Sequence, residues 1–357
     1  MCVVGSAEEV DVFIRLVYNL PMMNTNVKQN MSGITADEII NGRRLRRGED
    51  LSWMIEADLD ELTAGANRIR EAFRGNQVDL CTIINGKSGR CSEDCCFCAQ
   101  SNRYPGPCES YGFLDCDTIL AEAKGNWAEG VNRFSIVTAG RALRGEEFQS
   151  ALEAYRRMHE ETGLQLCASM GLLSREQLQQ LKEAGVSRYH ENIETSRRFF
   201  PQICTTHTYD DKIQVIRAAQ EVGLSVCSGG IIGMGETWED RIDMAISLAE
   251  LGIRSIPINV LTPIPGTPLE DRKRLDDAEI LRTVAIFRYL VPEADIRMAA
   301  GRVLCENHGA TLFESGASAA ITGNMLTTTG ATIREDREML SQLGRSIISS
   351  QEAIGGE

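Results

Sequence analysis

The sequence predicts an α/β fold: a closed (β/α)8 barrel of the TIM type with a helical extension at the N-terminus. Eight short runs rich in apolar and β-branched residues follow one another, and helical patterns lie between them. The short loops indicate parallel pairing, because parallel strands need a crossover connection. The 357 residues suffice for such a barrel, which takes about 250. An open, doubly wound sheet is the alternative.

The expected elements have the following bounds. The strands are residues 80–84, 133–138, 164–168, 188–193, 225–231, 255–261, 295–299 and 318–322. The helices between them include residues 148–159, 174–184, 210–222, 238–251 and 277–290. Glycine after a helix adopts the left-handed cap conformation at little cost, and four of these helices are followed by Gly163, Gly185, Gly223 and Gly252.

Four segments are expected along the chain. Residues 1–34 are an N-terminal extension, loosely ordered as termini often are. Residues 35–79 form helices that pack on the barrel, residues 80–330 form the barrel, and residues 331–357 form a C-terminal helix and tail. Thr35 is the expected N-cap of the first helix, with Asp37 and Glu38 in its first turn, and helical spacing returns over residues 59–73.

Charge and hydropathy exclude several classes of protein. With 37 basic and 51 acidic residues the net charge is −14, which argues against a nucleic-acid partner because phosphate binding needs excess Lys and Arg. No uncharged apolar stretch reaches the about 18 residues of a membrane span. The first residues are acidic where a signal peptide is basic. We therefore expect a cytoplasmic protein without a membrane partner.

The twelve cysteines are the most informative residues. They are too sparse for a disulfide scaffold, in which about 8–10% of residues are cysteine. In a reducing compartment thiols bind metal, take part in chemistry or pack as small apolar groups. Metal binding is the interpretation that the spacing favours.

Cys91, Cys95 and Cys98 have a C-x3-C-x2-C spacing directly after the first expected strand. Three thiolates on one short loop can bind three irons of a [4Fe–4S] cluster, and the fourth iron then has no protein ligand. An open coordination position lets a metal centre bind a substrate. A zinc site and inert buried cysteines are the alternatives, and Cys108 is poorly spaced for a second zinc pair. Cys96 is expected to point away.

This loop resembles the signature of radical S-adenosylmethionine enzymes. In that superfamily the open iron holds S-adenosylmethionine, and one electron from the cluster releases a 5′-deoxyadenosyl radical. Further motifs resemble the biotin synthase family over about residues 37–345. They are KSGRC at 87–91, AQSNRY at 99–104, SRYHENIETS at 187–196, CTTHTYDDK at 204–212, VCSGGIIGMGET at 226–237, PINVLTPIPGTPL at 257–269, IRMAAGR at 296–302 and GNMLTT at 323–328.

The resemblance implies an enzyme that inserts sulfur between two unactivated carbons of dethiobiotin. It also implies an auxiliary iron–sulfur cluster inside the barrel, of [2Fe–2S] or [4Fe–4S] type, as the sulfur source, a reducing electron carrier of the flavodoxin or ferredoxin type, and a homodimer. No acid–base residue is expected, because radical hydrogen abstraction needs none. The alternatives are another barrel enzyme of the superfamily, such as an [FeFe]-hydrogenase maturase, and a non-catalytic iron–sulfur protein.

Three polar residues are expected to face the ligands. Asn192 and Glu194 are two apart on an expected strand and so share one face. A carboxylate accepts hydrogen bonds from ribose hydroxyls, and an amide both donates and accepts. The resemblance places both residues at the ribose of S-adenosylmethionine, Asn192 also near dethiobiotin, and Asn259 at the ureido ring. A solvated strand end is the alternative for the first two residues.

A glycine-rich turn and a lysine complete the expected cofactor site. Gly229, Gly230, Gly233 and Glu236 belong to this turn, where missing side chains let the backbone approach a flat adenine. The resemblance gives the turn that role, and a plain turn is the alternative. The resemblance also makes Lys212 a cation for the methionine carboxylate, and a solvated lysine is the alternative.

The auxiliary cluster has an incomplete set of expected ligands. Cys167 and Cys227 match two of the family's cysteine ligands, and Arg297 matches its arginine ligand. Ser135 stands where the well-studied form has a third cysteine, and serine is a poorer ligand for a soft metal.

Two explanations of this loss remain. The auxiliary centre is absent, or another thiolate replaces the missing one, and we favour replacement. Cys204 follows the fourth expected strand and Cys305 the seventh, on the side where barrel active sites form. If both converge with the other two thiolates, four thiolates would suit a [4Fe–4S] centre better than a [2Fe–2S] one.

Overall fold

A computed structural model describes residues 33–326, 328 and 330–348 of the chain. The extension expected at residues 1–34 therefore lies outside the described residues except for its last two. The same holds for residues 349–357 of the expected C-terminal segment. In the part of the chain that is described, no helix combines the length and apolar character needed to cross a membrane.

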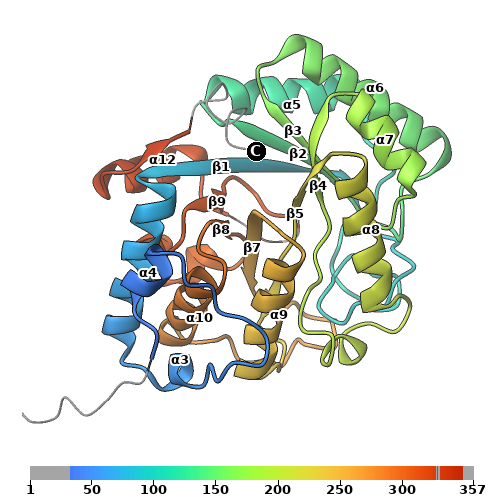
Figure 1. Cartoon of the computed structure of the whole chain (residues 1–357). Helices are drawn as coiled ribbons and strands as arrows, with labels where there is room; N and C mark the ends of the chain where they lie inside the picture. The colour runs from blue at the N-terminus through green and yellow to red at the C-terminus, as the bar shows by residue number, and fades with distance from the viewer. Residues whose placement is uncertain (1–32, 327, 329, 349–357) are drawn as a thin grey trace, which may run out of the picture. The chain divides into compact units, whose positions relative to one another are not determined.

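Parallel strands close into a barrel at the centre of the described part of the chain (Figure 1). Each strand pairs with the next, β5 and β6 both pair with β7, and β1 pairs with β9 to complete the ring. Because β5 and β6 are two halves of one strand position, the barrel has eight positions. This closure confirms the expected fold class and excludes the open sheet. The strands are β1 (Gln77–Lys87), β2 (Arg133–Thr138), β3 (Gln165–Ser169), β4 (Val186–His190), β5 (Ser225–Cys227), β6 (Gly230–Ile232), β7 (Ser255–Val260), β8 (Asp295–Met298) and β9 (Ala319–Ile321).

Helices surround the strands, and most begin at side chains that satisfy free backbone N–H groups. A capping box, in which the N-cap hydroxyl and an acidic or amide side chain bond reciprocally, starts α2, α7, α8, α9 and α12. The outer helices are α5 (Cys116–Ala128), α6 (Gly145–Glu161), α7 (Arg175–Glu183), α8 (Tyr209–Glu221), α9 (Trp238–Glu250), α10 (Asp277–Leu290) and α11 (Ala310–Glu314), with 3₁₀ turns η1 (Phe200–Gln202), η2 (Arg302–Leu304) and η3 (Glu306–Gly309).

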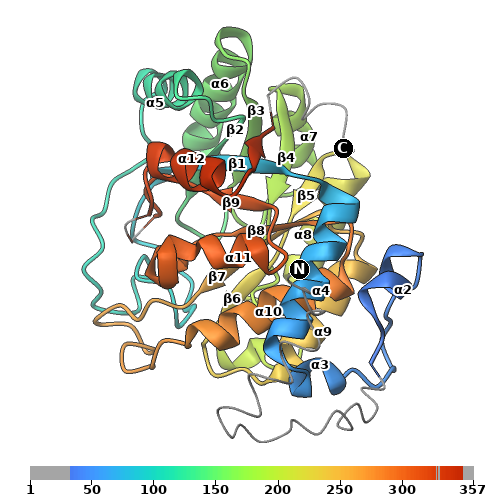
Figure 2. The ribbon, with the colours of Figure 1, turned by 90° about the vertical axis from the view of Figure 1, so that its left-hand side faces the viewer.

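The segments before and after the barrel pack on its outside. Helices α2 (Ala36–Ile40), α3 (Trp53–Glu56) and α4 (Leu59–Arg74) precede β1, and α4 lies against α10 (Figure 2). Trp53 meets Tyr289 of α10 edge to face with ring centroids 5.8 Å apart. After β9, α12 (Ile333–Gln342) leads to the short β10 (Ser346–Ile347), which pairs in parallel with the start of β1.

Several expected boundaries differ from the structure for local reasons. The strand expected at 188–193 ends at His190, and the one expected at 225–231 is interrupted at Ser228 and Gly229 to give β5 and β6. Gly163 does not act as a left-handed cap, because α6 ends at Glu161 and the chain is already extended at Thr162. The other three glycines do have positive φ values, as expected. Helix α5 was not anticipated.

A buried ion cluster occupies the N-terminal end of the barrel interior. The Asp79 carboxylate lies 2.7 Å from Nη2 of Arg297, 3.5 Å from Nε of Arg133 and 3.5 Å from Nη1 of Arg188. Asn132 Nδ2 donates to the other carboxylate oxygen at 2.8 Å. Burial alone would raise the pKa of Asp79, but the three guanidinium groups outweigh burial and hold that pKa below its usual range. The carboxylate therefore stays charged and joins four strands.

Replacing the Asp79 carboxylate is expected to destabilise the folded protein. Asp79→Asn should lower the free energy of unfolding by about 3–5 kcal/mol, because removing one member of a buried ion cluster leaves charge unbalanced inside the protein. The measurement is the urea unfolding midpoint of the protein without iron. Asp210→Asn is the control, since Asp210 pairs with Arg197 at the surface and such pairs contribute about 0–1 kcal/mol. Equal effects of the two substitutions would contradict the structural role of Asp79.

Candidate active site

A cavity of about 330 Å³ lies inside the barrel. Every strand position contributes to its wall, together with the loops that follow β1, β4, β7, β8 and β9. Active sites of such barrels form at the end where these loops gather. Among the residues expected from the sequence, those that line the cavity are Cys98, Cys167, Asn192, Glu194, Cys227, Asn259 and Arg297. Those that do not line it are Cys91, Cys95, Cys204, Lys212, Gly229, Gly230, Gly233, Glu236 and Cys305.

The three-cysteine loop follows β1 and is held by its own backbone. Cys91 N–H donates to the Gln100 carbonyl at 3.0 Å, and Asn102 N–H donates to the Cys91 carbonyl at 2.8 Å. Cys98 N–H donates to the Cys95 carbonyl at 3.0 Å, which makes a tight turn between these two thiols. Burial raises the pKa of the Cys98 thiol to about 11. Three soft donors on one short loop fit an iron–sulfur cluster, and the Cys98 side chain faces the cavity.

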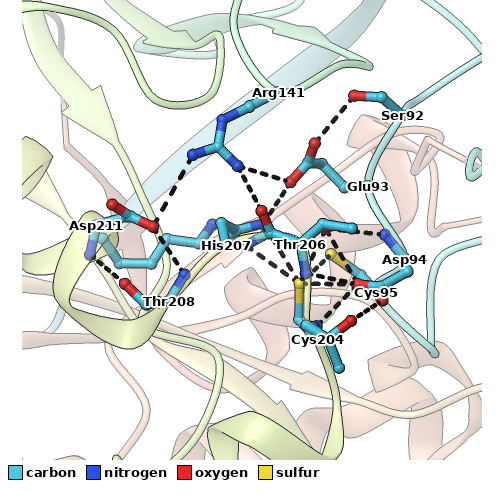
Figure 3. A network of polar contacts seen from close by, with 12 residues as sticks. Ser92, Glu93, Asp94, Cys95, Arg141, Cys204, Thr206, His207, Thr208 and Asp211 are labelled. Atoms are coloured by element: carbon cyan, nitrogen blue, oxygen red, sulfur yellow. Dashed lines mark hydrogen bonds and ion pairs between the residues drawn. The ribbon is translucent and has the colours of Figure 1, made fainter.

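Cys204 lies beside this loop rather than beside the strand cysteines (Figure 3). Its Sγ atom is 3.8 Å from that of Cys95 and 3.3 Å from Nδ1 of His207. The ligand atoms of these three residues all lie within 4.8 Å of one another. The hydrogen bond with Cys95, and then those with His207 and Thr206, lower the pKa of Cys204 to about 4.

Two carboxylates connect the three-cysteine loop to the segment after η1 (Figure 3). Asp94 accepts from the N–H groups of Thr205 and Thr206 at 2.9 and 3.1 Å. Glu93 lies 2.7 Å from Nδ1 of His207 and 3.2 Å from Nη1 of Arg141. The loop that carries the three thiols is therefore fixed to the loop after β4 by charge-assisted hydrogen bonds.

Asn192 and Glu194 reach the cavity from the loop after β4, not from a strand. The expectation that they share one strand face was wrong, because strand β4 ends at His190 and Glu194, which forms only an isolated bridge with Gly230, adopts a left-handed backbone with φ 67°. Glu194 N–H donates to the Gly229 carbonyl at 3.0 Å, and Asn192 Oδ1 accepts from Gly229 N–H at 3.0 Å. Both side chains nevertheless line the cavity.

One oxygen of Glu194 is left for a ligand. Its Oε2 atom is buried and has no hydrogen-bond partner among the described residues. Burial raises the pKa of this carboxyl, although the Lys212 ammonium acts in the opposite direction. A buried acceptor without a donor costs free energy, and a ligand hydroxyl would remove that cost.

Lys212 lies beside this carboxylate with its side chain 12% exposed, and it is already paired. Its Nζ atom lies 2.5 Å from Oε1 of Glu191. Burial lowers the pKa of Lys212, but the carboxylates of Glu191 and Glu194 outweigh burial and raise it. The alternative of a solvated surface lysine is therefore wrong.

The glycine-rich turn has a packing role in the structure. A Cβ atom at Gly229 would collide with the Pro257 carbonyl oxygen, and one at Gly230 would collide with the Glu194 carbonyl oxygen. Oε1 of Glu236 accepts from Gly233 N–H at 2.7 Å and so holds the turn from within. The glycines let strands and loops approach closely, and their contact with adenine stays a prediction.

Asn259 lines the cavity and joins two of its wall elements. Its Nδ2 donates to the Gly230 carbonyl at 3.1 Å, and its Oδ1 accepts from Ala300 N–H at 3.2 Å. An amide carries two N–H groups and two lone pairs, so one of each is left for a ligand. The fixed amide is thus oriented toward the cavity by backbone that does not depend on a ligand.

The strand cysteines lie deeper in the cavity and have basic neighbours. Arg133 Nη1 lies 3.7 Å from Cys167 Sγ, and Ser255 Oγ donates to Cys227 Sγ at 3.3 Å. Burial raises the pKa of Cys167, but a hydrogen bond from Cys81 and the guanidinium groups lower it below its usual value. Cys81 of β1 was not among the residues expected from the sequence.

The expected replacement ligands are not in this part of the cavity. Cys204 lies with the three-cysteine loop, as described above, because its loop is fixed there by Asp94. Cys305 packs between η2 and η3, where Arg274 Nη2 lies 3.5 Å from its thiol. The structure therefore does not bring Cys167, Cys227, Cys204 and Cys305 together as four thiolates.

Two protein-family models match most of the described chain. The model of the Radical SAM superfamily matches residues 87–248, and that of the Biotin and Thiamin Synthesis associated domain matches residues 257–346. A solved methylornithine synthase has a TM-score of 0.78 at 19% identity, covering 90% of this chain and 99% of that one. An [FeFe]-hydrogenase maturase from Carboxydothermus hydrogenoformans has a TM-score of 0.73 at 16% identity, covering 96% and 85%. These two likenesses show the fold alone.

Two relatives are far more similar in sequence. The biotin synthase of Clostridium beijerinckii is 60% identical over 312 residues, which cover 87% of this chain and 99% of the relative. The biotin synthase of Alkaliphilus metalliredigens is 59% identical over 307 residues, which cover 86% and 96%. Because the likeness extends over almost the whole of both relatives, the chain belongs to the biotin synthase family of radical S-adenosylmethionine enzymes.

Proposed function

We propose that this chain inserts sulfur into dethiobiotin to form biotin, using a [4Fe–4S] cluster, S-adenosylmethionine and an auxiliary iron–sulfur centre. The observation that carries the proposal is the content of one cavity. Cys98 faces it from the loop end, Glu194 and Asn259 face it from the wall, and Cys167 and Cys227 face it from the strands. A substrate held in this cavity would lie between a radical source and a sulfur source.

Cys91, Cys95 and Cys98 would hold the first cluster. When bound there with S-adenosylmethionine, the cluster supplies one electron that cleaves the sulfonium and yields a 5′-deoxyadenosyl radical. The residues of the chain fix the loop through Asp94 and Glu93 and thereby set where this occurs. A reducing electron carrier of the flavodoxin or ferredoxin type belongs to the proposal, because the cleavage consumes an electron. A homodimer remains a prediction from the resemblance.

Glu194 and Asn192 would bind the ribose of S-adenosylmethionine. The unpartnered Oε2 of Glu194 suits a hydroxyl donor, and the Asn192 amide can hydrogen-bond a second polar group. Lys212 would contact the methionine carboxylate through the N–H groups that its ion pair with Glu191 leaves free. Its positive charge also acts on Glu194 and Cys95.

The rest of the cavity suits the carbon skeleton of dethiobiotin. Asn259 would pair with the ureido ring through the donor and acceptor positions that the backbone leaves free. Apolar side chains from several strands and loops would hold the alkyl chain and keep water away from a reactive radical. They include Ile83, Phe97, Val137, Ile231, Val260 and Ile321. The auxiliary centre would be the substrate that donates sulfur, near Cys167 and Cys227.

Anaerobic turnover tests the proposed reaction. With reductant and S-adenosylmethionine, the reconstituted protein should form 5′-deoxyadenosine faster when dethiobiotin is present, and mass spectrometry should detect biotin. Cys98→Ala should abolish both products, because one cluster ligand is lost. No 5′-deoxyadenosine from the wild type would refute the radical mechanism. Formation that does not respond to dethiobiotin would refute the substrate.

Glu194→Gln tests the ribose contact. Replacing the charged acceptor by a neutral amide should raise the dissociation constant of S-adenosylmethionine about tenfold or more, since a hydrogen bond to a charged group contributes about 1.5–3 kcal/mol. Anaerobic equilibrium dialysis measures this constant, and iron content per chain should be unchanged. Glu239→Gln, at an exposed position near the start of α9, is the matched control. Identical affinities in all three proteins would remove Glu194 from the binding site.

A further inference from the structure

We infer that Cys81 of β1 is the third thiolate ligand of the auxiliary iron–sulfur centre, in place of the cysteine that Ser135 replaces. This inference rests on the proposed function, since it concerns the sulfur-donating centre of that reaction. It would make the ligand set Cys81, Cys167, Cys227 and Arg297. The supporting observations are the barrel layer that these residues share, the contacts between them and the charge around them.

Side chains inside an eight-stranded barrel of this kind form layers of four, and each layer comes from alternate strand positions. With β5 and β6 as one position, β1, β3, β5 and β8 are the first, third, fifth and seventh positions. Cys81, Cys167, Cys227 and Arg297 come from these four strands in that order, and all four line the cavity.

The strand register places them in the same layer. The strands are tilted relative to the barrel axis, so paired residues on neighbouring strands do not lie at the same height. To find the residue at the same height two strand positions away, one follows the pairing across the strand between and then moves two residues toward the C-terminus. From Cys81 the pairing leads across Arg133 to Gln165, and Cys167 is two residues beyond Gln165. The same step holds around the rest of the ring. From Cys167 the pairing leads across Arg188 to Ser225, and Cys227 is two residues beyond. From Cys227 it leads across Ser255 to Asp295, two residues before Arg297, and from Arg297 it leads across Ala319 to Asp79, two residues before Cys81.

Contacts around this layer agree with the register. The side chains of Cys81, Cys167 and Cys227 line the same cavity as Arg297, and Arg297 lies within electrostatic reach of both Cys81 and Cys227. Cys81 is buried, and its thiol also points toward the carbonyl of Thr82 at 3.4 Å. Three thiols and one guanidinium thus surround one end of the cavity.

The charge below the layer suits an anionic group. Arg133, Arg188 and Arg297 all contact the single carboxylate of Asp79, which lies two residues before Cys81 on the same strand. Thiolates and the sulfides of an iron–sulfur centre are negative, so the guanidinium groups of Arg133 and Arg188 beside them lower the cost of burying that charge. Soft thiolates are also the ligands that such centres prefer.

No other described thiol meets the same conditions. Cys204 is held by the three-cysteine loop, and Cys305 lies between η2 and η3 outside the cavity wall. Ser135 lines the cavity from β2, opposite Ile83 and Cys167 in the strand register, but its hydroxyl is a poor ligand for iron. Cys81 therefore replaces the lost ligand from the neighbouring strand.

The test compares cluster content after anaerobic reconstitution with iron and sulfide. Iron and acid-labile sulfide per chain and Mössbauer spectra would be measured for the wild type, Cys81→Ser and Cys81→Ala. A Cys167→Ala/Cys227→Ala double variant defines the signal of the first centre alone. Both Cys81 variants should lose the second spectral component and match the double variant. The change that S-adenosylmethionine causes in the EPR signal of the first centre should persist, which shows that the variants are folded.

Cys305→Ser is the matched control, because Cys305 and Cys81 are each only 6% exposed. It should keep the wild-type iron content and spectrum. If the Cys81 variants keep the second component, Cys81 is not a ligand, and the proposed function is unaffected. If the wild type itself matches the double variant, there is no auxiliary centre, and both the proposed sulfur source and the role of Cys81 fail.

Discussion

The barrel interior depends on one buried carboxylate. Asp79 forms ion pairs with the guanidinium groups of Arg133, Arg188 and Arg297, which come from three other strands, so one negative charge connects four strands. Without it these arginines would face one another in a nearly dry space, and their repulsion would oppose closure of the barrel. With the Asp79 carboxylate present, the arginines form a positively charged layer next to the strand thiols. Anionic sulfur can then be buried in the barrel at a lower cost.

The two chemical tasks of the site fall on different parts of the fold. The radical source is assigned to a loop, which Asp94 and Glu93 fix to the segment around His207. The sulfur source is assigned to side chains on the strands themselves, where neighbouring backbone pairs set each position. A loop can accept a large ligand such as S-adenosylmethionine, whereas strands hold small donors at fixed separations.

The sequence was sufficient for the fold class and for the three-cysteine loop, because both depend on local patterns. Strand and helix alternation predicted the barrel, and C-x3-C-x2-C predicted the cluster loop. The ends of strands were less predictable: the left-handed backbone of Glu194 and the interruption at Gly229 arise from contacts between loops. Cys81 was missed because its relation to Cys167 and Cys227 follows from barrel tilt and register, which no short window of sequence contains. Cys204 was misplaced because Asp94, more than a hundred positions away in the chain, decides where it lies.

The interruption between β5 and β6 has a mechanical consequence. The loop after β4 fills the gap: Glu191 N–H donates to the Cys227 carbonyl at 3.0 Å, and Glu194 bonds the backbone of Gly229 and Ile231. Glu194, the residue expected to bind the ribose, and Cys227, the residue expected to bind iron, are therefore connected by one continuous set of backbone hydrogen bonds. A substitution that moves the backbone at Gly229 would therefore disturb the hydrogen bonds of Glu194 as well as the peptide chain next to Cys227.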